Sequence, residues 1–191
     1  MAKRNKFVTA DTHFGHANIL KFSAATRPWN SADEMDEALI NAWNNKVSPD
    51  DIVYHLGDFA MCGFQKAMSI AEQLNGEIVL IRGNHDQIFR KDQNIQKALS
   101  SGKFSSIVDY HEIRLPDEAN RPQTIVMSHY AMRVWNKSHY GSYMLFGHSH
   151  GSLKGEGRSV DVGIDSSEMD SEGAPFAIED VIAFLYNKCC I

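Results

Sequence analysis

The chain has 191 residues, of which 43% are hydrophobic and 23% are charged, and its net charge is −5 at pH 7 with neutral histidines. This composition is ordinary for a globular protein and excludes a chain that is disordered throughout. The sequence contains no block of five or six like charges, which excludes a polybasic arm for nucleic acid, and no apolar run long enough to span a membrane.

The first half of the chain alternates short apolar runs with helical patterns. Turn residues separate them, such as Ser48-Pro49-Asp50 and Asn75-Gly76. In chain order we expect a strand at 6–10, a helix capped by Ser31 or Asp33 and running to about Lys46, a strand at 51–56, a helix at 64–74, a strand at 77–82 and a helix at about 92–101.

The second half of the chain is mostly β. Strands without long helices between them are predicted at 104–115, 123–128, 143–146 and 158–163, and a last helix is predicted at about 178–186. The two halves together predict an α/β protein with a mixed sheet or two packed sheets and helices outside. The length fits a single domain that covers residues 1–191.

The three cysteines and the start of the chain bear on its location. Cys62, Cys189 and Cys190 form no CxxC pair, so a disulfide framework is not expected and a reducing cytosol fits best. The first residues are basic but lack the apolar stretch of a secretory signal. We therefore expect a cytoplasmic protein that does not associate with membranes.

Nine histidines are present, and most of them belong to short polar motifs. Each motif follows a predicted strand. The motifs are Asp11-x-His13, Gly57-Asp58, Gly83-Asn84-His85-Asp86, His129 and Gly147-His148-x-His150. Because sites in open α/β sheets form beyond the carboxyl ends of the strands, five strand ends can direct these side chains into one volume.

The residue types in these motifs are those of a metal centre. Aspartate and histidine suit Mn, Fe, Zn, Ni and Co, and the pattern includes no thiolate. Two residues separated by one position point to the same side of an extended segment, and a preceding glycine allows a sharp turn and a close approach of two backbones. Any one motif is more often a turn or a surface histidine, but the five in this order favour a metal site.

The order of these motifs resembles that of the calcineurin-like metallophosphoesterase superfamily. The strings DTHFGHANIL (11–20), TRPW (26–29) and VYHLGDF (53–59) resemble a small subgroup of bacterial and phage phosphoesterases. The resemblance implies two packed mixed β-sheets flanked by helices, an αββα sandwich. It also implies two divalent metal ions as cofactors, with manganese expected and iron, zinc, nickel or cobalt as alternatives.

The resemblance also implies a ligand set in which every position is filled. One metal is implied to bind Asp11, His13, Asp58 and His150, and the other to bind Asp58, Asn84, His129 and His148. Asp58 is then the bridging carboxylate. Two such ions can share a hydroxide, which attacks phosphorus in line with the leaving oxygen.

Two further residues of the third motif are expected to act in catalysis. The resemblance gives His85 the role of protonating the leaving oxygen or stabilising its charge. Asp86 is expected to orient the His85 ring, with a helix N-cap as the alternative for its carboxylate.

Three residues are candidates for substrate binding. Arg82, in the string LIRGNH, is similar to an arginine that contacts the substrate phosphate in related phosphatases, and a salt bridge at the strand end is the alternative. Arg27 and His16 are weaker candidates for the same task. His55 lies close to Asp58 in sequence, so it either supports a ligand or is a buried histidine with a backbone partner.

The expected activity is hydrolysis of a phosphate ester, and a phosphodiester is preferred. A phosphomonoesterase that acts on a nucleotide or phosphoprotein is the alternative, followed by a metal-binding scaffold without activity. A scaffold would be expected to have a broken ligand set or to lack His85, and the sequence shows neither. A nucleotide or nucleic acid is compatible with the site, although no patch of aromatic and basic residues marks a nucleic-acid groove.

Overall fold

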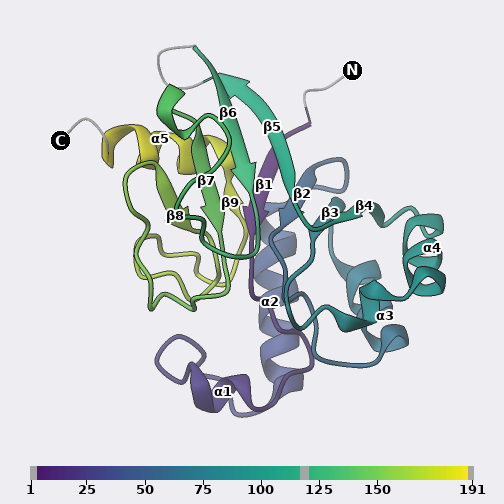
Figure 1. Ribbon diagram of the computed structural model, residues 1–191. Coiled ribbons are helices and arrows are strands. Elements are labelled where there is room, and N and C mark those ends of the chain that lie inside the picture. Colours follow the sequence, from purple (N-terminus) through teal and green to yellow (C-terminus); the bar gives the residue numbers. More distant parts are fainter. Residues whose placement is uncertain (1–3, 117–120, 189–191) are drawn as a thin grey trace.

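Two β-sheets face each other across the centre of the molecule (Figure 1). The computed structural model describes residues 4–116 and 121–188. The first sheet has the strand order β4-β3-β2-β1-β9, and all neighbouring strands are parallel except the β1–β9 pair. Its strands are β1 (Lys6–Thr9), β2 (Ile52–His55), β3 (Glu77–Ile81), β4 (Phe104–Val108) and β9 (Phe176–Ala177).

The second sheet has the strand order β5-β6-β7-β8. The β5–β6 pair is antiparallel, while β6, β7 and β8 run parallel to one another. The strands are β5 (His111–Pro116), β6 (Pro122–Met127), β7 (Tyr143–Phe146) and β8 (Ser159–Asp161). Both sheets therefore contain parallel and antiparallel pairs, as the family resemblance implied.

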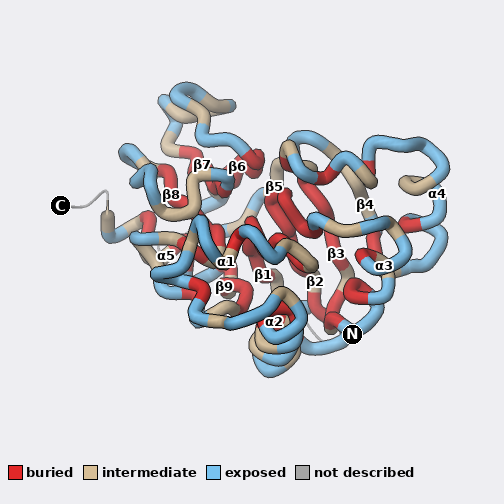
Figure 2. Tube along the Cα trace, turned by 90° about the horizontal axis from the view of Figure 1, so that it is seen from below, coloured by how far each residue is buried: buried red, intermediate tan, exposed pale blue. Residues whose placement is uncertain are grey.

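The space between the sheets is filled by apolar side chains from both of them. Val8 of β1 and Leu56, which directly follows β2, pack with Met127 and Leu145 of the second sheet in one buried cluster. Helix α5 (Ile178–Lys188) adds Val181 and other residues to this cluster. The buried part of the chain follows the strands, while the connecting loops are mostly exposed (Figure 2).

Helices cover the other face of the first sheet. Helices α2 (Ala32–Lys46), α3 (Phe64–Gln73) and α4 (Asp92–Ser100) bury apolar residues in a second cluster with side chains of β1 to β4. Trp43 of α2 and Ile70 of α3 are examples. The predicted arrangement of two mixed sheets flanked by helices is confirmed.

The shorter elements lie outside these layers. Helix α1 (Ile19–Phe22) follows the first motif, and two 3-10 helices, η1 (Gln87–Arg90) and η2 (Ser138–Tyr140), lie in loops. On the outer face of the second sheet, Met132 and Trp135 pack against a small buried cluster on β6 and β7. This face of the second sheet is thus partly covered by the loop that precedes η2.

The predicted strand at 104–115 is wrong in one respect. The segment forms two strands, β4 and β5, which belong to different sheets and are separated at Asp109 and Tyr110. Strand β4 pairs with β3, whereas β5 pairs with β6. An apolar pattern records which residues face a core, but it does not record that the chain leaves one sheet and enters another.

The predicted start of α2 is confirmed. The Ser31 side chain accepts a hydrogen bond from the Glu34 backbone N–H at 3.1 Å, so Ser31 rather than Asp33 is the N-cap. Among the described residues, the helices are too short or too polar to cross a bilayer. The cysteine Cys62 is a free thiol, while Cys189, Cys190 and the first three residues lie outside the described part of the chain.

Candidate metal centre

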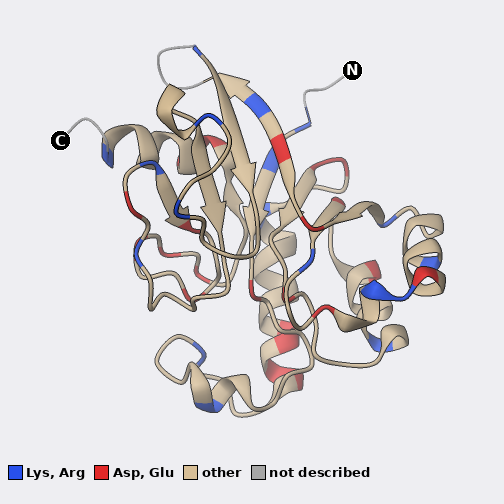
Figure 3. Cartoon of the chain, viewed as in Figure 1, with Lys and Arg blue, Asp and Glu red and all other residues tan. Residues whose placement is uncertain are grey.

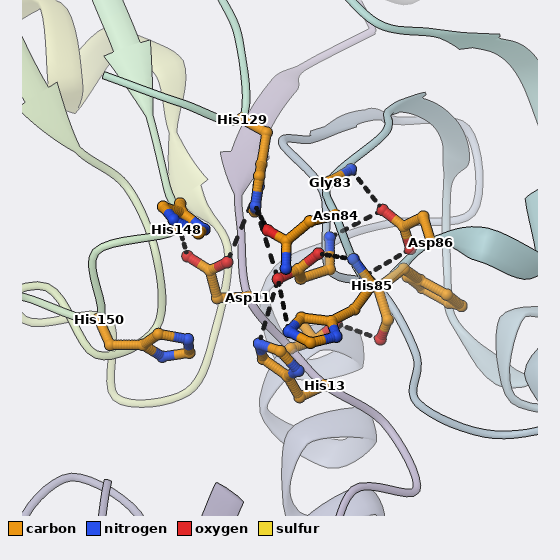
Figure 4. A network of polar contacts seen from close by, with 12 residues as sticks. Asp11, His13, Gly83, Asn84, His85, Asp86, His129, His148 and His150 are labelled. Carbon is orange, nitrogen blue, oxygen red and sulfur yellow. Dashed lines mark hydrogen bonds and ion pairs between the residues drawn. The ribbon is translucent and has the colours of Figure 1, made fainter. Parts of the chain in front are cut away.

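The five polar motifs come together beyond the carboxyl ends of β1, β2, β3, β6 and β7 (Figure 4). The first three of these strands are parallel neighbours in one sheet, and the other two are parallel neighbours in the facing sheet. All five chain segments therefore reach the same end of the two-sheet core. The sequence predicted this convergence from the position of each motif after an apolar strand.

Six of the predicted ligands form two compact groups. One contains Asp11, His13 and His150, and the other contains Asp58, His129 and His148. Within each group, one ligand atom from each residue lies within 4.8 Å of the others. These spacings allow each group to surround one ion.

Asp58, a member of the second group, also faces the first group. Its Oδ2 is 3.6 Å from His13 Nε2 of the first group and 3.5 Å from His129 Nε2 of its own group. Asn84, the seventh predicted ligand, has its Oδ1 3.1 Å from His129 Nε2. One carboxylate oxygen thus faces a histidine on either side, and a neutral amide oxygen faces the second group.

Five of the seven predicted ligands have left-handed backbone conformations. The φ angles of Asp11, His13 and Asp58 are 59°, 50° and 54°, and those of His148 and His150 are 69° and 47°. Such a conformation costs about 1–2 kcal/mol for a residue with a side chain, and strained backbone clusters at functional sites. Hydrogen bonds between the loops hold it, including Asp11 N–H to Gly57 O and His13 N–H to Asp58 O at 3.0 Å each.

The glycine before Asp58 is required by close packing of the loops. Gly57 has a φ of 94°, and a Cβ there would lie 2.5 Å from Gly83 N and 2.6 Å from His129 Nδ1. No side chain fits between these atoms. The close approach that the sequence predicted at this strand end is thus possible because Gly57 has no Cβ.

Buried polar atoms in the first group lack partners among the described residues. They are Asp11 Oδ1 and both ring nitrogens of His13. The other oxygen of Asp11 accepts a hydrogen bond from the His148 backbone N–H at 2.8 Å. Because buried polar groups are nearly always satisfied in proteins, the unpaired Asp11 oxygen and the lone-pair nitrogen of the neutral His13 ring fit a cation that lies between them.

The electrostatics of the first group agree with this fit. Burial raises the pKa of Asp11 well above its ordinary value, and the nearby carboxylates of Asp161 and Asp58 raise it further. Burial also lowers the pKa of His13 to about 2, with further lowering from His150 and Arg27. His13 is therefore neutral, as metal ligation requires, and a divalent cation would favour the ionised form of Asp11.

The second group has the same donor chemistry. The Nδ1 of His129 lies 2.8 Å from the Leu56 carbonyl oxygen. A carbonyl only accepts, so Nδ1 carries the proton and Nε2 presents a lone pair in the neutral ring. This lone pair faces Asn84 Oδ1 and Asp58 Oδ2, which are also acceptors. A cation resolves the conflict, and nitrogen and oxygen donors without a thiolate suit Mn, Fe, Co, Ni or Zn.

The His85 ring lies at the rim of the centre. Its side chain is 41% exposed, and its Nε2 is 4.0 Å from Asp58 Oδ2. It belongs to neither ligand group, and its ring centroid is 5.4 Å from that of His13. His85 is therefore accessible to a molecule that reaches the centre from solvent.

His16 is brought close to both His13 and His85. Its ring centroid is 5.3 Å from that of His13 and 6.4 Å from that of His85. Burial lowers the pKa of His16, and the proximity of His85 and Arg27 lowers it further. The structure thus places this substrate-binding candidate beside the first ligand group.

Asp86 does not make the contact expected from the sequence. Its Oδ2 accepts the backbone N–H of Asp58 and of Gly83 at 2.8 and 2.7 Å, and its Oδ1 accepts that of Phe59 at 3.0 Å. Its side chain makes no N-cap hydrogen bond either. Both expectations for this carboxylate are corrected, because its two oxygens join the loops that carry Asp58 and Asn84.

Burial raises the pKa of Asp86 to about 6, although the hydrogen bond from Gly83 and those from the other two N–H groups act in the opposite direction. The carboxylate is therefore held in the loop region at an electrostatic cost. Such a cost is typical of a buried group whose hydrogen bonds define local geometry.

Arg27 is also corrected. The side chain is only 1% exposed, so it is almost wholly buried. It donates to Asp165, to the backbone oxygens of Asp11 and Thr12, and to Met35 Sδ. These contacts use all five N–H donors of a guanidinium, so none is left for a substrate phosphate.

Arg82 makes the salt bridge that was the alternative to substrate binding. Its Nε and Nη2 donate to the two oxygens of Asp109 at 2.9 and 2.7 Å, and its Nη1 donates to the Phe89 carbonyl at 3.2 Å. The guanidinium is therefore occupied by the segment between β4 and β5. The geometry favours a structural role at this strand end.

His55 supports the first motif through Thr12. Thr12 Oγ1 donates to the Phe59 carbonyl at 2.8 Å and lies 2.9 Å from His55 Nε2. Since the hydroxyl has one hydrogen, it accepts from the protonated Nε2. Burial lowers the pKa of His55 to about 3, so the ring is neutral.

Three buried carboxylates that support the centre were missed. Asp36 accepts the Gly15 backbone N–H at 2.8 Å, Asp161 accepts the Ser149 hydroxyl at 2.5 Å, and Asp165 lies 2.7 Å from His150 Nδ1. Asp36 is a polar residue on the buried face of α2, and Asp161 lies in a predicted strand. A charged residue at such a position is a signal in the sequence that could have identified both. Asp165 follows β8 outside any motif and gave none.

Comparison with known proteins gives a family and a fold. A family model described as calcineurin-like phosphoesterase matches residues 7–152. An uncharacterized protein of Methanocaldococcus jannaschii is 46% identical over 98 residues, which are 50% of this chain and 54% of that protein. The chain thus spans about half the length of this relative.

Two other comparisons extend over most of the chain. The gene 66 protein of Mycobacterium phage D29 is 26% identical over 186 residues, with 85% of this chain and 88% of that protein covered. The crystal structure of a protein of unknown function from Aquifex aeolicus is similar with a TM-score of 0.65 and 20% identity. That likeness covers 94% of this chain and 98% of the other, and it shows a shared fold.

Proposed function

The chain belongs to the calcineurin-like phosphoesterase family, and we propose that it hydrolyses a phosphodiester with two divalent metal ions, manganese being the native metal. The observation that carries this proposal is the position of Asp58, which belongs to the second ligand group and also faces His13 of the first group. A single group would support a mononuclear site, whereas two groups that adjoin one carboxylate support a bridged pair. The sandwich fold, with motifs from both sheets, supports the same reading.

In this proposal Asp11, His13, Asp58 and His150 hold one ion, and Asp58, Asn84, His129 and His148 hold the other. When bound, such a pair of ions lowers the pKa of water to supply a nucleophile near neutral pH and neutralises charge that develops on phosphate oxygens. The strained loops and their hydrogen bonds hold the seven side chains in place before substrate arrives, so little reorganisation is needed during the reaction.

His85 is the residue that we propose to act on the leaving group. Its ring is exposed at the rim, while the Asp58 carboxylate lies 4.0 Å from its Nε2. From this position it can donate a proton to the departing oxygen or stabilise its charge. His16, close to both His13 and His85, is proposed to contact a phosphate oxygen.

The open rim favours a diester over a monoester. His85 and His148 are both exposed, so the phosphate can carry a substituent on either side of the centre. Two exposed aromatic rings adjoin the centre: Tyr130 packs edge-on against His148 with centroids 4.7 Å apart, and Phe22 adjoins His16 with centroids 6.5 Å apart. Such rings can contact a base or another planar ester group.

The charge distribution favours a small ester over a long polymer. Basic and acidic residues are interspersed along the chain (Figure 3), and the net charge is −5. A protein that binds a nucleic-acid backbone usually presents a continuous basic stripe. A nucleotide diester therefore fits this centre better than a duplex, and phosphomonoester hydrolysis is the second candidate.

A single domain over residues 1–191 and a cytoplasmic location stay predictions.

The test is hydrolysis of bis-p-nitrophenyl phosphate and p-nitrophenyl phosphate by the metal-depleted protein after addition of Mn²⁺, Fe²⁺, Co²⁺, Ni²⁺ or Zn²⁺. We expect two ions per chain and faster turnover of the diester, with the greatest stimulation by Mn²⁺. Faster turnover of the monoester would assign a phosphatase. Absence of turnover with all five metals, at full metal loading, would contradict an enzymatic function.

A further inference from the structure

A buried chain of polar contacts lies behind the first ligand group. Asp165 is 3% exposed and accepts a hydrogen bond from His150, whose Nδ1 lies 2.7 Å from Asp165 Oδ2. The same carboxylate accepts from Arg27 through Nε and Nη2 at 2.8 to 3.2 Å and from the Thr26 hydroxyl. The Asp165 carboxylate thus joins a ligand side chain to a buried arginine.

The other donors of Arg27 reach the loop that carries the remaining two ligands. Nη2 donates to the Asp11 carbonyl at 2.5 Å, and Nη1 donates to the Thr12 carbonyl at 3.2 Å. These two carbonyls belong to the turn in which Asp11 and His13 have left-handed backbones. One guanidinium therefore ties the turn after β1 to the carboxylate that contacts His150.

We propose that Asp165 is a positioning residue for the first metal, because it fixes His150 with the proton on Nδ1 and Nε2 free, while Arg27 holds Asp11 and His13 in register with that ring. This inference rests on the proposed metal-dependent function. It assigns to the Arg27–Asp165 pair the alignment of three ligands that come from two sheets.

The two ligand groups differ in this support. In the second group His129 is oriented by a backbone carbonyl, that of Leu56, and the His148 side chain is exposed to solvent. The hydrogen bond that orients His129 does not involve Arg27 or Asp165. A change at Asp165 should therefore act on one metal and spare the other, which a general loss of stability would not do.

The first experiment measures Mn²⁺ binding to the full chain by equilibrium dialysis with elemental analysis. In Asp165→Asn we expect one of the two binding steps to weaken by about 10–100-fold, the usual effect of losing a partner of a metal-bound histidine. The other step should change by less than about threefold. Equal weakening of both steps, or no change in either, would overturn the inference.

The matched control is Asp51→Asn. Asp51 is 4% exposed and accepts the backbone N–H groups of Asn5 and Ser48, at the opposite ends of the strands from the metal centre. This variant also loses a buried carboxylate, and thermal unfolding should show lowered stability. Both Mn²⁺ steps should remain as in the wild type, so that a lowered affinity in Asp165→Asn is not ascribed to destabilisation.

A second measurement needs no variant at Asp165. Long-range ¹H–¹⁵N spectra of the wild-type protein, metal-depleted and Zn²⁺-loaded, report which nitrogen of each histidine carries a proton, and the His150 signals are assigned by their loss in His150→Gln. We expect the proton on Nδ1 in both states. A proton on Nε2 would overturn the inference even if Asp165→Asn does not fold.

The outcomes also separate this inference from the function on which it rests. If the wild-type protein binds no metal, the proposed function fails, and the spectrum of the metal-depleted protein still decides the His150 tautomer. If the wild-type protein binds two ions and Asp165→Asn binds them equally well, the function stands and the positioning role of Asp165 is refuted.

Discussion

Replacing Gly57 with alanine tests whether close packing of the ligand loops holds the centre together. The added Cβ would lie 2.5 Å from Gly83 N and 2.6 Å from His129 Nδ1, at a φ of 94°. The unfavourable backbone conformation costs about 1–2 kcal/mol, and overpacking against atoms that cannot rotate away costs about 1–3 kcal/mol more. We therefore expect Gly57→Ala to lower the free energy of unfolding by about 2–5 kcal/mol.

The control for this change is Gly102→Ala. Gly102 also has a positive φ, of 75°, but no atom lies within 4 Å of a Cβ added there. Only the backbone cost of about 1–2 kcal/mol should remain. Thermal unfolding measures the difference, since 1 kcal/mol corresponds to about 2–4 °C in a chain of this size.

Metal content adds a second readout to this comparison. The Cβ of Gly57→Ala would displace the His129 ring from its hydrogen bond with Leu56, so the second metal should be lost or weakened. Gly102→Ala should keep both metals. If Gly57→Ala is no less stable than Gly102→Ala and binds two ions, close packing of the ligand loops does not hold the centre together.

Three further variants test individual side chains. His85→Asn should keep both metals and change the free energy of unfolding by less than about 0.5 kcal/mol, because the ring is exposed. Its kcat should fall by about 10²–10⁴-fold. The fall in kcat should be smaller for nitrophenyl than for nucleoside esters, and equal losses would contradict an acid role. Asp58→Asn should lower the affinity of both metals and abolish activity at ordinary metal concentrations, so full activity would refute bridging. Arg82→Gln should cost about 1–2 kcal/mol and leave KM unchanged, because the pair with exposed Asp109 contributes little and the hydrogen bond to the Phe89 carbonyl is also lost. A clear rise in KM would restore the substrate-binding prediction.

The sequence predicted the alternation of strands and helices and the meeting of the motifs because both depend on local patterns. Those patterns left a mixed sheet or two packed sheets open, and the two packed sheets followed from the family resemblance. Apolar runs end in polar motifs at β1, β2 and β3, and parallel strands bring such ends to one edge. The capping of α2 by Ser31 depends on a partner three residues away. Features encoded within one turn or one strand are readable in this way.

The features that were missed depend on contacts between distant segments. Asp86 and Asp165 satisfy groups on other loops, and nothing in their neighbouring residues indicates those partners. Arg27 was a candidate for substrate binding, which needs an accessible guanidinium, yet its side chain is only 1% exposed. A charged residue whose partners come from distant segments has no signature in its own stretch of sequence.

The left-handed ligands were also beyond the reach of sequence patterns. A glycine indicates that such a conformation is permitted, but Asp11, His13 and His150 adopt it as ordinary residues. Their conformations follow from the loops that are hydrogen-bonded across strand ends, which become defined only when the strands have paired. Local propensity alone would place these residues in extended or right-handed regions.

The pairing of β9 with β1 has a consequence for how the protein matures during synthesis. Phe7 and Val8 pair with Ala177 and Phe176, so the first strand of the chain meets one of the last. All seven proposed ligands have been translated by the time that His150 emerges, but Asp165 and β9 have not. A nascent chain at that stage holds the ligands without the segments that complete the sheet and support His150. Because contacts this distant in sequence form slowly, we expect metal capture to be a late event that follows the pairing of β9 with β1.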